Sequence, residues 1–197
     1  MAGLPYVLLA HAYAGDTAQH WQSWLAGRLA HLGVQVDLLT FTDPDKPELD
    51  FWLAELHEHL DAAPADAERV VLAHAVGAAL WLHHAAARPA PARRVDRVLL
   101  VAPPGAQWHE ANVREFEPAP IDPAGIRRAA AYTRLVTSND DPTRPVHDAG
   151  LLAAELDIDW DVIPDGGQLN AESGYGRWPA VLEWVRTGEA PLHGHGR

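Results

Sequence analysis

Short runs rich in apolar residues alternate along this chain with longer segments whose apolar residues recur every three or four positions. The runs are residues 5–12, 34–41, 69–74, 95–102, 132–138 and 158–163. Runs such as 5–12 are almost continuously apolar, which is typical of a strand that is covered by helices on both faces. The alternation therefore predicts six mostly parallel strands with helices on both faces of the sheet.

The segments between the runs have the spacing of amphipathic helices. Residues 18–32 place three leucines and two tryptophans on one helical face, and the segment that opens near Pro47 repeats this pattern. Further helices are expected over residues 76–88, 145–156 and 178–187. Residues 103–128 hold five prolines and little periodicity, so we expect an irregular excursion over the sheet edge that builds pocket walls.

Length and charge limit what such a chain does. Its 197 residues, 48% of them apolar, fit a single domain over 1–188, followed by a flexible tail over 189–197. The net charge of -12 disfavours nucleic acid and anionic membranes as partners, since both are bound through clustered Lys and Arg. We find no signal-peptide leader and no apolar run of about 20 residues, so we expect a cytoplasmic protein.

Two residue counts narrow the chemistry further. The chain has no cysteine, which excludes a thiolate nucleophile, and its only serines are Ser23, Ser138 and Ser173. His57 and His59 lie two positions apart on a helix, hence on different faces, and no HExxH spacing occurs. We therefore expect no metal site and no cofactor.

The segment AHAVG at residues 73–77 follows an apolar run and opens a helix. At the nucleophile elbow of α/β-hydrolases the corresponding turn is G-x-S-x-G, where a sharp turn needs small residues. In this chain the central residue is Ala75. Small residues between a strand and a helix are common, so this match alone is weak.

Three further segments fall after predicted strands. They are HAYAGDTAQHW at 11–21, SNDDP at 138–142 and GGQLNAESGYGRWP at 166–179. With LLVAP at 99–103, they make the chain resemble the small single-domain serine hydrolases of the family that includes human retinoblastoma-binding protein 9. The resemblance runs from about residue 5 to 185 and implies a three-layer α/β-hydrolase fold.

The same resemblance aligns the catalytic positions. It places Ala75 at the serine position, Asp141 at the acid position and Gln168 at the histidine position. A methyl group cannot attack a carbonyl, and a neutral amide cannot replace imidazole as general base. We therefore expect no Ser-His hydrolysis. Ser173 shares a loop with Gln168, but the family pattern has a serine there too, and Ser23 and Ser138 are better explained as capping or turn residues.

Other parts of such a site are expected to remain. Backbone N–H groups of Val76 and Tyr13 would form an oxyanion hole if the loops are built as in the family. The Gln168 amide could donate a hydrogen bond to Asp141. Without a cationic partner, burial would raise the pKa of Asp141 and make it an acid or base, although a structural acceptor role is the more common one.

The histidines near this site have two interpretations each. His11 ends the first strand beside the oxyanion loop, and His74 adjoins Ala75, so either could reach the pocket. Packing is the stronger expectation for His74, whereas the two readings are nearly even for His11. We expect His20 with Trp21 to be structural, and Trp108 to contact the ligand.

Three functional hypotheses remain. The leading one is a hydrolase fold repurposed to bind a small carbonyl or carboxylate compound, with acid-base, isomerising or cyclising chemistry. The second is a pseudoenzyme that binds another protein through an exposed apolar patch around Trp108 and Phe116. The third is a serine hydrolase or esterase that was inactivated by substitution, which would require changes at both Ala75 and Gln168.

Overall fold

The computed structural model describes residues 4–12, 18–87 and 94–194, and its centre is a single sheet. The strands are β1 (Tyr6–Ala10), β2 (Gln35–Leu38), β3 (Arg69–His74), β4 (Val95–Val101), β5 (Ala130–Ser138) and β6 (Asp159–Ile163). Their order is β2-β1-β3-β4-β5-β6, and every neighbouring pair is parallel. The six predicted strands and the α/β-hydrolase architecture are thereby confirmed.

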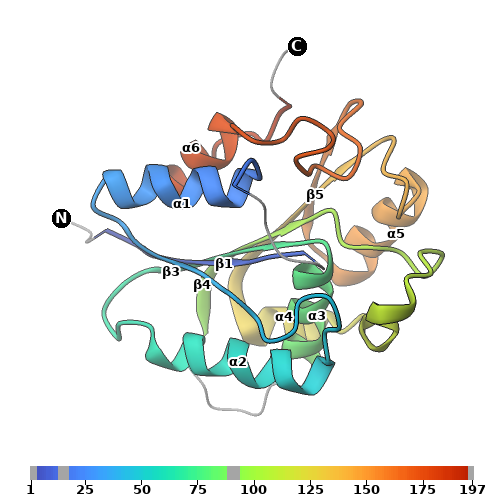
Figure 1. Cartoon of the computed structure of the whole chain (residues 1–197), viewed down its shortest axis with the longest axis horizontal. Helices are drawn as coiled ribbons and strands as arrows, with labels where there is room; N and C mark the ends of the chain where they lie inside the picture. The colour runs from blue at the N-terminus through green and yellow to red at the C-terminus, as the bar shows by residue number, and fades with distance from the viewer. Residues whose placement is uncertain (1–3, 13–17, 88–93, 195–197) are drawn as a thin grey trace.

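Helices cover both faces of this sheet, which gives three layers (Figure 1). The helices are α1 (Trp21–His31), α2 (Leu49–Ala62), α3 (Val76–Ala87), α4 (Pro123–Ala129), α5 (Val146–Leu156) and α6 (Pro179–Thr187). α1 and α6 lie on one side, and α2, α3 and α4 lie on the other (Figure 1).

The continuous apolar runs are explained by two separate cores. Along β1, Tyr6, Leu8 and Ala10 pack into the core under α2 and α3, whereas Val7 and Leu9 pack into the core under α1 and α6. Successive side chains of a strand point to opposite faces, so a strand between two cores must be apolar at every position.

The excursion over residues 103–128 is more regular than expected. It contains a 3-10 helix, η1 (Ala111–Phe116), and then α4, so the expectation of an irregular segment is wrong at its end. Two local signals start α4: Asp122 caps it by accepting the Gly125 N–H at 2.8 Å, and Pro123 occupies the first turn. Neighbouring prolines hid these signals.

Part of the predicted tail packs on the domain. Leu192 is buried, and the Trp178 indole N–H donates to the His193 carbonyl at 2.9 Å. Flexibility of the remaining tail residues stays a prediction, because 195–197 lie outside the described residues.

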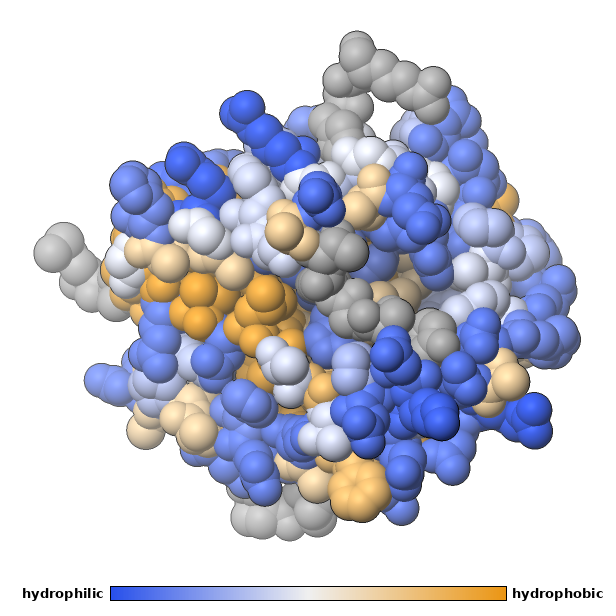
Figure 2. All heavy atoms as spheres, viewed as in Figure 1, coloured by the Kyte–Doolittle hydropathy of each residue, from blue (hydrophilic) through white to orange (hydrophobic). Residues whose placement is uncertain are grey.

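β2 forms one open edge of the sheet. Leu38 at its end is exposed, and Figure 2 shows apolar surface gathered between α1 and α2 over this edge. Among the described helices, none combines the length and the apolar composition needed to cross a bilayer.

Candidate active site

The turn between β3 and α3 has the backbone shape of a nucleophile elbow. Ala75 lies between these elements with a φ of 48°, a left-handed conformation that non-glycine residues rarely adopt. Its N–H donates to the Val101 carbonyl at 2.9 Å, and its carbonyl accepts the Ala78 N–H at 2.9 Å. The turn therefore presents residue 75 at the carboxyl ends of the strands, and the side chain presented is a methyl group.

Gly77 explains why this turn needs small residues. A Cβ atom at this position would lie 2.6 Å from the carbonyl oxygens of Ala10 and His11. Helix α3 thus packs directly on the backbone at the end of β1. Val76 is the first residue of α3, so its N–H belongs to the turn whose N–H groups lack partners within the helix.

Asp141 follows β5 and is buried, with 6% of its surface exposed. Its Oδ1 accepts two hydrogen bonds from Thr143, from the N–H and from the hydroxyl, both at 2.8 Å. Its Oδ2 is buried and has no hydrogen-bond partner among the described residues. Burial raises the pKa of Asp141 despite these hydrogen bonds and the nearby Arg144, which is the direction expected from the sequence.

Gln168 follows β6, but the expected hydrogen bond from its amide to Asp141 is not formed. The Gln168 Oε1 instead accepts from the Asn170 side-chain amide at 3.3 Å. This contact uses the amide oxygen as an acceptor, and the Gln168 Nε2 forms no hydrogen bond with the Asp141 carboxylate. The Asp141 Oδ2 is consequently left without the donor that an imidazole would supply.

Neighbouring contacts nevertheless bring the three loops together. The His74 ring Nε2 lies 2.9 Å from the Gln168 carbonyl, which joins the elbow to the Gln168 loop. Asp140 Oδ1 accepts the Gly167 N–H at 2.7 Å, which joins the Asp141 loop to the same segment. Positions 75, 141 and 168 are thus held at one edge of the sheet.

The structure favours packing roles for the histidines. His11 is 3% exposed, lies 5.1 Å from the Phe41 ring and accepts the Phe41 N–H at 3.4 Å. His74 is 1% exposed and lies 4.8 Å from the His20 ring. His20 caps α1 by accepting the Gln22 N–H, as expected. We therefore assign no ligand contact to His11 or His74.

Ser138 and Ser173 also have structural partners. Ser138 is fully buried and its hydroxyl contacts Asp140 Oδ1 at 2.5 Å, the Ile163 carbonyl at 3.0 Å and the Gly166 N–H at 2.8 Å. The Ser173 hydroxyl donates to Asn170 Oδ1 at 3.0 Å within a turn. Neither contacts an imidazole that could act as its base.

Trp108 and Phe116 do not form an exposed apolar patch. Phe116 is fully buried and packs edge-to-face against Trp52, with ring centroids 5.4 Å apart, so this element of the protein-binding hypothesis is wrong. The prediction of an exposed Phe116 was wrong because a proline-rich segment with little periodicity does not indicate which of its side chains face the interior. Trp108 is half-buried and lines a cavity whose walls include none of Ala75, Asp141 and Gln168.

Tyr13, the other expected N–H donor of the oxyanion hole, lies outside the described residues. The His57 and His59 side chains contact different partners, His84 and Asp37, as their spacing predicts. Within the described ranges, no three His, Asp or Glu side chains are grouped to hold a metal ion.

Sequence reasoning missed three polar residues around the site. Asp140 ties the loops together, and its hydrogen bonds with Ser138 and Gly167 lower its pKa. Arg144 donates to the carbonyls of Pro103 and Pro104, which fixes the Asp141 loop to the segment after β4. Glu117 is half-buried on that segment. Only the doubled aspartate in SNDDP hinted at any of them.

Comparisons with known proteins agree with this architecture. A family model described as serine hydrolase matches residues 7–187. The ydeN gene product of B. subtilis superposes with a TM-score of 0.79 and 23% identity, covering 93% of this chain and 97% of that one. A YdeN-like hydrolase from Pectobacterium atrosepticum has a TM-score of 0.70 and 22% identity, with coverages of 93% and 90%.

A more distant likeness is the esterase domain of a Rhodothermus marinus protein, with a TM-score of 0.65, 15% identity and coverages of 94% and 88%. A comparison with curated proteins finds no match. At these identities the structural likenesses show the fold alone.

Proposed function

Because the chain belongs to the serine hydrolase family of α/β-hydrolases, we propose that it keeps the family's site but not its hydrolytic reaction. In this proposal the chain binds a small carbonyl or carboxylate compound at the edge where residues 75, 141 and 168 meet. The observation that carries the proposal is Ala75 in the left-handed turn. A serine there would be the nucleophile, whereas a methyl group has no lone pair to attack with.

The backbone at the elbow supports binding of negative charge. Helix α3 starts at Val76, and the positive end of its dipole together with the N–H groups at its start favours an anion. A ligand carboxylate, or the oxygen of a polarised carbonyl, would be stabilised there without a nucleophile.

Asp141 supports acid-base chemistry at the same place. Its Oδ2 lacks a hydrogen-bond donor and burial raises its pKa, so the carboxyl would exchange a proton nearer to neutral pH than an exposed aspartate. If the bound compound has an acidic C–H beside its carbonyl, the proton would move to Asp141. The electron pair would move to the carbonyl oxygen held by the N–H groups.

The loss of hydrolysis is tested with a fluorophosphonate probe and p-nitrophenyl acetate. We expect no labelling and no ester cleavage by the unmodified chain. The double variant Ala75→Ser with Gln168→His regains both serine and imidazole, so we expect it to be labelled at position 75. The single variant Ala75→Ser lacks the base and should be labelled at least 100-fold more slowly.

Labelling of the unmodified chain would refute the proposal. The matched control is Ser173→Ala in the double variant, which should leave labelling unchanged. Restored labelling would also argue that the site geometry is intact and not merely degraded.

Ligand binding is tested separately with hexanoate, which carries a carboxylate on a short apolar chain. We expect its addition to shift the backbone amide resonance of Val76 in a ¹⁵N-labelled sample. Shifts confined to positions away from the elbow, or no shift at millimolar hexanoate, would contradict a ligand site there.

A further inference from the structure

The segment after β4 lines a half-open cavity that the proposed hexanoate site does not use. Its volume is about 560 Å³, within the usual range for small-molecule sites. Apolar groups line most of it, namely Ala106, Trp108, Ala111, Val113 and Pro118. The polar residues of its lining are His109, Glu110, Arg114 and Glu117.

Glu117 is the unusual member of this lining. Its Oε2 accepts only a long hydrogen bond, 3.3 Å, from the Ala119 N–H. Its Oε1 is buried and has no hydrogen-bond partner among the described residues. A buried carboxyl oxygen without a donor disfavours the ionised form of Glu117, so a positive charge beside this side chain would be stabilising.

Arg144 does not donate a hydrogen bond to Glu117. Arg144 and Glu117 attract each other, but the Arg144 Nε and Nη2 donate to the carbonyls of Pro103 and Pro104. The same guanidinium also attracts the carboxylates of Asp141 and Asp148. Arg144 therefore attracts three carboxyl groups, but its guanidinium forms a hydrogen bond with none of them.

We propose that this cavity binds a small organic ammonium ion, with its charged group beside the Glu117 side chain and its apolar body against Trp108. The indole face attracts a cation, and the apolar walls shelter its carbon skeleton. Glu110 adds a second carboxylate to the lining, and Arg114 adds one positive charge. The chain's net charge of -12 raises the local concentration of cations.

Binding is measured by titration calorimetry with 2-phenylethylammonium, 2-phenylethanol and 3-phenylpropionate, at pH 8 and at pH 5.5. We expect the ammonium to bind at least tenfold more tightly than the alcohol and the carboxylate not to bind. The ammonium stays charged at both pH values, whereas Glu117 is largely protonated at pH 5.5, because burial raises its pKa to about 7. Affinity should therefore fall at least fivefold at pH 5.5.

The variant Glu117→Gln should weaken binding of the ammonium at least tenfold, and Trp108→Leu should weaken it several-fold. Glu155→Gln, which removes an exposed carboxylate from α5, is the charge-matched control and should bind as the unmodified chain does. If Glu117→Gln fails to fold, the pH dependence of the unmodified chain decides the question.

Equal affinity for the alcohol and the ammonium, preference for the carboxylate, or binding that survives Glu117→Gln would each overturn the proposal. The variant Ala75→Ser changes a residue that does not line this cavity and should leave ammonium binding unchanged. Failure of this site and failure of the hexanoate site are therefore distinguishable.

Discussion

At the scale of single residues, the elbow depends on how closely α3 approaches β1. Ala75 holds a left-handed φ that costs about 1 kcal/mol for a residue with a Cβ atom, so its surroundings must fix it. Gly77 allows those surroundings, because only a hydrogen atom fits between α3 and the two carbonyls at the end of β1.

We therefore expect Gly77→Ala to destabilise the fold by about 3 kcal/mol, since the new methyl would overlap two backbone oxygens that cannot move independently. The measurement is urea unfolding followed by circular dichroism. Gly27→Ala in α1 is the matched control: nothing lies within 4 Å of a Cβ there, and alanine favours a helix by about 0.5–1 kcal/mol. A change of under 1 kcal/mol at Gly77 would contradict this account of the elbow.

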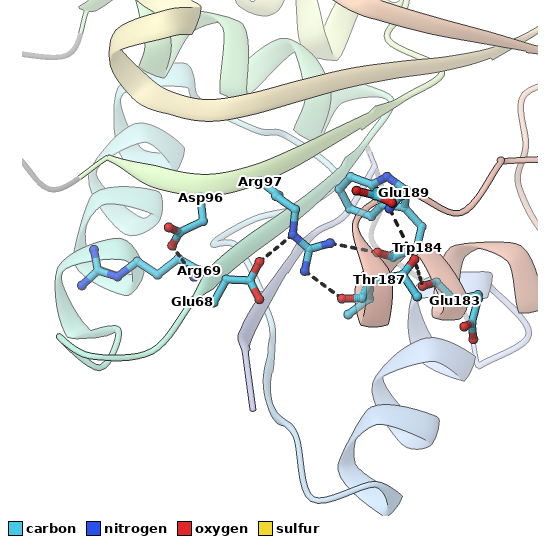
Figure 3. A network of polar contacts seen from close by, with 9 residues as sticks. Glu68, Arg69, Asp96, Arg97, Glu183, Trp184, Thr187 and Glu189 are labelled. Carbon is cyan, nitrogen blue, oxygen red and sulfur yellow. Dashed lines mark hydrogen bonds and ion pairs between the residues drawn. The ribbon is translucent and has the colours of Figure 1, made fainter. Parts of the chain in front are cut away.

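At the scale of elements, the end of α6 is fixed by a residue from β4. Arg97 donates through Nη1 and Nη2 to the carbonyls of Trp184 and Val185, both at 2.8 Å, and through Nε to Glu68 at 2.7 Å (Figure 3). These carbonyls belong to the last turn of α6, where the Trp184 carbonyl also accepts the Gly188 N–H at 2.7 Å. The network lies beside a cavity of about 750 Å³ at the amino-terminal edge of the sheet, opposite the elbow.

We expect Arg97→Met to lower the free energy of unfolding by about 2–3 kcal/mol, because two helix-end carbonyls lose charged donors in a mostly buried place. The exposed Glu68 partner should account for little of this loss. Arg186→Met, which removes a solvent-exposed arginine from the same helix, should change the stability by under about 0.5 kcal/mol. Similar losses in both variants would show that Arg97 is not a clamp on α6.

At the scale of the whole molecule, titratable groups gather at the carboxyl edge of the sheet. Burial raises the pKa of Glu117 from 4.5 to about 7 and also raises that of Asp141. The folded state therefore holds these protons more tightly than the unfolded chain does. Their stabilising contribution is complete below the unfolded pKa values and is lost as the pH rises through the folded ones.

Glu117→Gln keeps the shape of the carboxyl group but cannot ionise. Its stability relative to the unmodified chain should therefore rise by about 2 kcal/mol between pH 5 and pH 8, a figure reduced for partial exposure of the side chain. Urea unfolding at the two pH values measures this difference. Glu155→Gln should show no such change, and a flat difference for Glu117→Gln would mean that Glu117 is not desolvated.

The sequence by itself determined the sheet, the helices that cover it and the identity of the elbow. These features depend on apolar periodicity and on small residues at one junction, which are local and repeat along the chain. It also placed Asp141 and predicted that burial would raise its pKa. Helix α4 was missed because the neighbouring prolines masked its Asp122 and Pro123 start signals.

Only the tertiary structure decided which polar groups meet. It gave Gln168 a partner in Asn170 and not in Asp141, buried Phe116, and drew His11 and His74 into the packed interior. It also placed the carboxyl groups of Glu117 and Asp141 where both interact electrostatically with Arg144, although Glu117 lies more than twenty residues from the others in sequence. Hydrogen bonds and desolvation depend on distances of a few ångströms between strand ends, and those distances exist only once the sheet has aligned the loops.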